Sequence, residues 1–121
     1  SASPELQQYG EALLTAFARV MAVVREAQCP SRQTQAATAL ANAHVFLEMT
    51  GHVVVAWIWL RQALVAAEKL ETADNPERDF YRGKLQACRF FFRWELPKTQ
   101  QWHALLDEPD PTCEEMQDAW F

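Results

Sequence analysis

The 121-residue chain has the length of one domain, half of its residues are hydrophobic and only 3 are glycine, a composition that favours long helices over sheets. Its formal net charge of -5 provides no basic field to attract nucleic acid or an anionic membrane, and we expect neither as a partner. We therefore expect one helical domain over residues 1–121.

Cysteine usage and the N-terminal sequence indicate a cytoplasmic setting. Cys29, Cys88 and Cys113 are odd in number, widely spaced and without a Cys-x-x-Cys pair, as is typical of free thiols in a reducing compartment. No signal-peptide pattern opens the chain. The longest apolar run, 53–60, is far shorter than the roughly 20 residues that a membrane span needs. A chain that starts at Ser1 rather than Met and enters a helix at once suggests a piece of a longer protein.

The first predicted helix runs from Pro4 to about Gln28. Ser3 can cap it, proline at the first position lacks only an unneeded N–H, and Glu5 lies at the positive end of the helix dipole. Its apolar stripe has spacings of three and four and comprises Leu6, Tyr9, Leu13, Phe17, Val20 and Val24, with Leu14 and Met21 beside them.

The second predicted helix, from Arg32 to about Thr72, is the most apolar segment, and the rest of the chain is expected to pack around it. Gly51 costs about 1 kcal/mol relative to alanine inside a helix, which suggests a close neighbour or a kink. At 100° per residue the helix carries two adjoining apolar stripes, which we interpret as its core face. They are Leu40, Ala43, Leu47, Val54, Ile58 and Val65, and Phe46, Val53, Trp57, Leu60 and Leu64.

The remaining face of this helix is a mixed strip that we interpret as a contact surface for another domain or subunit. It carries His44, Glu48, His52, Val55, Trp59 and Gln62. The assignment predicts that Trp57→Ala destabilises the domain, whereas Trp59→Ala leaves the melting temperature nearly unchanged and alters association.

The third predicted helix begins with Asn75 as its cap and Pro76 at its first position, and it breaks or turns at Leu96-Pro97. Its broad apolar face comprises Phe80, Tyr81, Leu85, Cys88, Phe91, Phe92 and Leu96, extended by Phe90 and Trp94. A short segment with Trp102 and a capping box at Thr112-x-x-Glu115 predict one or two short C-terminal helices. Because residues 29–31 and 73–76 are short connections, we expect an all-α, up-down bundle of three long helices, similar to a four-helix bundle.

Two stretches carry a family resemblance: ANAHVFLEMTGHVVVAWIWLRQALVAAEKL and DFYRGKLQACRFFFRWELPKT. A Gly-His before an apolar, Trp-containing helix, followed by Phe-Tyr, Lys-Leu, Arg-Phe-Phe and Leu-Pro, resembles the C-terminal helical domain of bacterial acyl-CoA dehydrogenase-like flavoproteins. These include enzymes similar to the methylmercaptopropionyl-CoA dehydrogenases. The resemblance covers roughly residues 4 to 110.

The resemblance implies a parent oxidoreductase of fatty acid metabolism that uses FAD for α,β-dehydrogenation of an acyl-CoA. In that chemistry a glutamate removes the α-proton while flavin N5 accepts a hydride, and both features belong to preceding domains. No position here matches them, so the resemblance implies no catalytic and no cofactor-binding residue in this chain. It implies a domain for packing or subunit assembly, whose partners are the preceding domains and a homo-oligomer.

Two groups of side chains on the predicted helix surfaces have the composition of a ligand-binding site. His44, Glu48 and His52 follow at four-residue spacing and could face one point, but neither HExxH nor a Glu-x-x-His pair is present, so we expect an interface strip rather than a metal site. Arg82, Arg89 and Arg93 form a basic stripe that suits a phosphate or an acidic neighbouring domain. The alternatives for this stripe are a solvated helix face or pairing with Glu5, Glu11 or the acidic tail.

Three charges fall within apolar arcs: Arg61, Lys84 and Glu95. Because an unpaired buried charge is costly, we expect them to pair or to extend to solvent, with Arg61–Glu95 first and Lys84–Glu48 next. Cys88 lies among aromatic and aliphatic residues, where burial raises a thiol pKa and argues against a nucleophile.

Two other functions remain open from the sequence. One is a free-standing interaction module that binds a protein through the Trp59 face or the arginine stripe. The other is a small metal-binding bundle.

Overall fold

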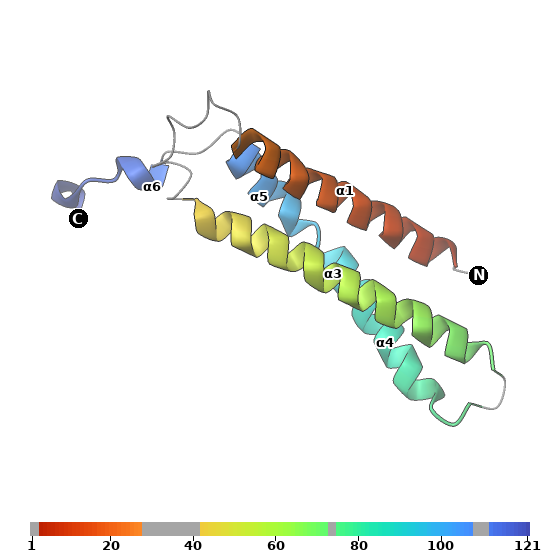
Figure 1. Ribbon diagram of the computed structural model, residues 1–121. Coiled ribbons are helices and arrows are strands. Elements are labelled where there is room, and N and C mark those ends of the chain that lie inside the picture. The colour runs from red at the N-terminus through yellow and green to blue at the C-terminus, as the bar shows by residue number, and fades with distance from the viewer. Residues whose placement is uncertain (1–2, 28–41, 73–74, 108–111) are drawn as a thin grey trace.

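The computed structural model describes residues 3–27, 42–72, 75–107 and 112–121, and in these residues it contains helices and no strand. Two long helices, α1 (Pro4–Ala27) and α3 (Ala43–Leu70), run side by side in opposite directions (Figure 1). A third rod consists of α4 (Arg78–Phe90), the π-helix η2 (Phe91–Glu95) and α5 (Lys98–Asp107), and it runs back along α3. The predicted all-α class is confirmed.

Helix α1 begins as its sequence predicts. The backbone N–H of Leu6 donates to Ser3 Oγ at 3.3 Å, which satisfies one of the free donors of the first turn. Leu6, Ala16 and Val20 are buried in the core, with Tyr9 and Leu13 packed against it. Phe17, a member of the predicted apolar stripe, is half exposed.

Helix α3 lies in the middle of the bundle and contacts α1, α4 and α5. It continues without a break through Gly51, so the suggested kink is absent. Residues 28–41, which include the predicted start of this helix, its connection to α1 and Leu40, lie outside the described residues. The buried positions of α3 follow at spacings of three and four along one face: Val45, Met49, Val53, Ala56, Leu60, Ala63 and Ala66.

The predicted core face of α3 is wrong by roughly a third of a turn. Val53 and Leu60 are buried, but most of the bulky members of the two stripes are exposed: Leu47, Val54, Trp57, Ile58, Leu64 and Val65. The neighbouring rods pack instead against the side that carries Ala56, Ala63 and Ala66. Small side chains let helix backbones approach closely, so the alanine side offers the tighter packing.

By length and composition α3 would suffice to cross a membrane, which the short run 53–60 did not suggest. Its 18-residue window has a mean hydropathy of 1.4, and 28% of the window is buried within the bundle. The same length and composition are found in core helices of soluble proteins, so this single helix is weak evidence for a span.

Asn75 organises the start of the third rod. Its Oδ1 accepts from the backbone N–H of Glu77 at 2.8 Å, and its Nδ2 donates to the carbonyl of Lys69 at 3.2 Å. The amide therefore fixes the turn and ties it to the end of α3. Helix α4 begins at Arg78, slightly later than the predicted start at Pro76.

A π-helical turn precedes Pro97. The backbone N–H of Leu96 donates to the carbonyl of Phe91 at 2.8 Å, five residues back. Since proline has no N–H and its ring crowds the preceding turn, the wider π geometry adapts the chain to it. Cys88, Phe92 and Leu96, each four residues from the next, are buried in one core.

The predicted apolar face of the third rod is wrong at three positions. Phe80, Phe90 and Trp94 are exposed, and the rings of Phe90 and Trp94 stack on the surface with centroids 6.2 Å apart. After α5, the short helix α6 (Thr112–Glu115) and the 3-10 turn η3 (Asp118–Trp120) extend away from the bundle (Figure 1).

Candidate functional site

His52, predicted as part of an interface strip, lies between α3 and the third rod. Its Nδ1 is 3.2 Å from the carbonyl of Glu48, and its Nε2 is 3.2 Å from Glu95 Oε1. The imidazole also contacts the rings of Phe91 and Trp102, with centroids 5.6 Å and 4.7 Å away. A neutral imidazole can donate to one of these oxygens, and an imidazolium can donate to both.

Glu95 joins His52 to the start of α5. Its second oxygen accepts from Lys98 Nζ at 2.8 Å. These two partners, Lys98 first and His52 second, lower the pKa of the Glu95 carboxyl. The group of His52, Glu95 and Lys98 thus connects three elements of the bundle through hydrogen bonds within the chain.

The other two members of the predicted cluster of His44, Glu48 and His52 are exposed. Among the residues described, no group of three or more His, Cys, Asp or Glu side chains lies close enough to hold a metal ion. The role of His44 and Glu48 in a contact surface stays a prediction.

In the arginine stripe, Arg89 forms an ion pair with Glu5. Arg89 donates from Nε to Glu5 Oε1 at 2.7 Å and from a terminal nitrogen to Oε2 at 2.9 Å. This bidentate pair connects α4 to the start of α1. The Tyr9 hydroxyl donates to the same carboxylate. Arg89 first and Tyr9 second lower the pKa of Glu5 to about 2. Arg82 and Arg93 are exposed.

Arg61 and Lys84 contact aromatic rings rather than the predicted carboxylates. The Arg61 guanidinium lies over the Trp57 ring at 5.2 Å. Lys84 Nζ lies 5.6 Å from the Trp59 ring and 5.2 Å from the Phe80 ring. Trp59 is partly buried and packs against the core, so the relation predicted for Trp57 and Trp59 is reversed.

Cys88 is fully buried between the rods, and desolvation raises the pKa of its thiol to about 11. A thiol in this setting stays protonated at neutral pH and is a poor nucleophile. Cys113 is exposed, and Cys29 lies outside the described residues.

The largest unassigned feature is the outward apolar side of α3. Leu47, Val54, Ile58 and Val65, here called the outer strip, lie opposite the buried face and have exposed fractions of 44% to 68%. Their hydrophobicity led us to place them in the core, so the sequence identified the residues and misjudged what they contact. A row of exposed apolar residues on one helix marks a surface for another protein or domain.

Comparison with known proteins identifies the family of the chain. A family model described as "Acetyl-CoA dehydrogenase C-terminal like" matches residues 1–117. The chain belongs to this family. The predicted resemblance to the C-terminal domain of acyl-CoA dehydrogenase-like proteins is confirmed.

A curated relative of this acyl-CoA dehydrogenase C-terminal domain is the broad-specificity linear acyl-CoA dehydrogenase FadE5 of Mycobacterium tuberculosis. The two are 32% identical over 77 residues, which is 63% of this chain and 13% of the relative. The chain therefore spans about one eighth of the length of that protein.

Proposed function

We propose that this chain is a non-catalytic domain that packs against the preceding domains of a cytoplasmic, FAD-dependent acyl-CoA dehydrogenase and supports its assembly into an oligomer. The observation that carries the proposal is the outer strip, because a helix that is apolar on both sides is typical of a core that a single bundle does not complete. Family membership supports the identity of the parent enzyme. The parent reaction would be α,β-dehydrogenation of an acyl-CoA.

The docking surface is tested by charge substitutions at the end of the outer strip nearest the start of α3. Leu47→Asp and Val54→Asp should leave the melting temperature of the isolated domain within a few degrees of the unchanged chain, because both side chains are exposed. In the full parent protein the same changes should lower the oligomeric state and increase proteolysis of this domain. Gln86→Asp, on the exposed side of α4, is the matched control.

Parent protein that keeps its assembly with both substitutions would contradict docking through the outer strip. His44→Asp tests, in the same assay, the mixed strip of α3 that carries His44. The effects of the two surfaces on assembly are thus compared directly. The parent activity has a separate test: anaerobic addition of an acyl-CoA should bleach the bound flavin of the purified parent protein. A parent without flavin would overturn this part of the proposal.

The free-standing interaction module finds less support. Its two surfaces were the Trp59 face and the arginine stripe, and in the structure Trp59 packs against the core while Arg89 pairs with Glu5.

A further inference from the structure

A groove of about 460 Å³ lies between the second half of α3 and the start of α4. Ile58 and Val65 form one wall and Phe80 forms the other, and all three are exposed. Ala66, which is buried, contributes to the lining with a single methyl group and so leaves depth between the helices. The groove presents apolar surface that the bundle itself does not cover.

Two cations line this groove in a protein with net charge -5. Arg61 and Lys84 lie over aromatic rings, and neither takes part in an ion pair among the residues that the structure describes. Cations held at an apolar surface favour an occupant that carries apolar side chains beside carboxylates.

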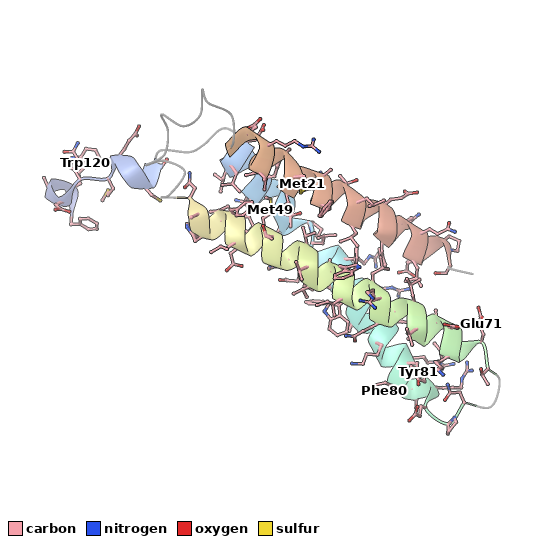
Figure 2. The ribbon with its side chains drawn as sticks, in the orientation of Figure 1. Met21, Met49, Glu71, Phe80, Tyr81 and Trp120 are labelled. Carbon is pink, nitrogen blue, oxygen red and sulfur yellow. The ribbon has the colours of Figure 1, made fainter. Side chains whose placement is uncertain are left out.

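The end of this chain has that composition. Residues 112–121 carry Met116, Trp120 and Phe121, whose exposed fractions are 45%, 62% and 94%, and the exposed carboxylates Glu115 and Asp118. Figure 2 shows Trp120 at one end of the molecule and Phe80 and Tyr81 of the groove at the other. Trp120 therefore lies far from the groove of its own chain.

We propose that residues 112–121 of one chain dock into the α3–α4 groove of a second copy, with Trp120 and Phe121 against the apolar walls and Asp118 near Lys84 and Arg61. From Ile58 to Ala66 the groove follows α3 for about 12 Å, at a rise of 1.5 Å per residue. Residues 118–120 form the 3-10 turn η3, which spans about 6 Å at a rise of about 2.0 Å per residue, so this turn and Phe121 fit within that length. Exchange of the two segments forms a closed, symmetric dimer. The groove shares Ile58 and Val65 with the outer strip, so the proposed function is tested at Leu47 and Val54, which do not line the groove.

The test is the association of the full chain, measured by sedimentation over a wide concentration range. The unchanged chain should dimerise, and Trp120→Ala with Phe121→Ala should raise the dimer dissociation constant by about tenfold or more. Lys84→Glu should weaken the dimer and Arg82→Glu, an equal charge change on the same helix, should not. Asp118→Lys alone should also weaken the dimer. The combination of Asp118→Lys with Lys84→Glu should restore the dimer, because it reverses both charges of the pair.

A labelled peptide of residues 112–121 provides a second readout. It should bind the chain that carries Trp120→Ala and Phe121→Ala, and Lys84→Glu in that chain should abolish binding. A monomeric chain at all concentrations, or a dimer that is indifferent to the tail and to Lys84, overturns the proposal. A monomer in which the tail is protected from protease shows docking within one chain and overturns the second copy as occupant. None of these results depends on flavin or on the parent enzyme.

Discussion

At the scale of single residues, two tryptophans of α3 that are two positions apart have different environments. Trp59 packs against the core below Lys84, whereas Trp57 is half exposed and carries the Arg61 guanidinium over its ring. Both are tryptophans in the same apolar run, so side-chain type does not separate them. Their order is set by which side of α3 meets the neighbouring rods.

This difference predicts the outcome of matched substitutions. Trp59→Ala should reduce the free energy of unfolding by roughly 2 to 4 kcal/mol, since it removes an aromatic ring that packs on the core. Trp57→Ala should cost about 1 kcal/mol or less, because its ring is half in solvent. Urea unfolding of the two variants provides the measurement, and an equal loss in both would show that the orientation of α3 is different.

The Glu5–Arg89 pair predicts a pH dependence of stability. Because Arg89 lowers the pKa of Glu5 from 4.5 to about 2 in the folded chain, the contribution is fully present above about pH 4.5 and is lost as pH falls towards 2. Both side chains are more than one-third exposed, so solvent screening limits the contribution to about 1 kcal/mol or less.

Thermal unfolding of the unchanged chain and of Glu5→Gln between pH 7 and pH 2 measures it. The difference in melting temperature between the two should shrink across this window. Glu11→Gln, on the exposed side of the same helix, serves as the control. A difference in melting temperature that stays constant down to pH 2 would mean that Arg89 does not lower the pKa of Glu5.

At the scale of elements, α3 carries a second apolar row on its outward side, and this row includes a glycine. Gly51 lies between Leu47 and Val54 in the row. A Cβ added at Gly51 would meet no atom within 4 Å. Neither a kink nor a neighbour inside the bundle therefore explains this glycine, which suits close approach by a helix from outside.

Gly51→Ala should accordingly stabilise the isolated chain. The gain expected is about 0.5 to 1 kcal/mol, the difference in helix propensity between the two residues. Chemical denaturation measures it, with Ala56→Gly as a reference that should destabilise because Ala56 is buried. A loss of stability in Gly51→Ala would reveal a contact on the outer side of α3 within the folded chain.

At the scale of the whole molecule, the bundle leaves a large apolar surface uncovered on α3 and on the third rod. An isolated domain of this kind should bind a hydrophobic fluorescent dye while fully folded. Leu47→Glu with Val54→Glu should reduce the dye signal at an unchanged melting temperature, since the two side chains lie outside the core. Unchanged dye binding would place the accessible apolar surface elsewhere on the molecule.

Local sequence chemistry predicts the start or end of several helices, and residue patterns predict the family. Capping at Ser3, the proline at the start of α1, the Asn75 turn and the break at Pro97 depend on local chemistry, and each lies where the residues predict it within a few positions. The membership follows from residue patterns in the same way. Pairing of Arg89 with Glu5 was among the alternatives that the charges allowed.

Which face of α3 is internal depends on how the three rods pack and could not be predicted from the sequence. A helix that is apolar around most of its circumference has no periodicity that distinguishes a face packed within the bundle from a face kept for another protein. The neighbouring rods selected the side with Ala56, Ala63 and Ala66, where backbones approach most closely, and this turned Leu47 and Val54 outward. Local chemistry thus set the helices, while the packing of the rods placed His52 and Trp59 against neighbouring elements and left the outer strip exposed.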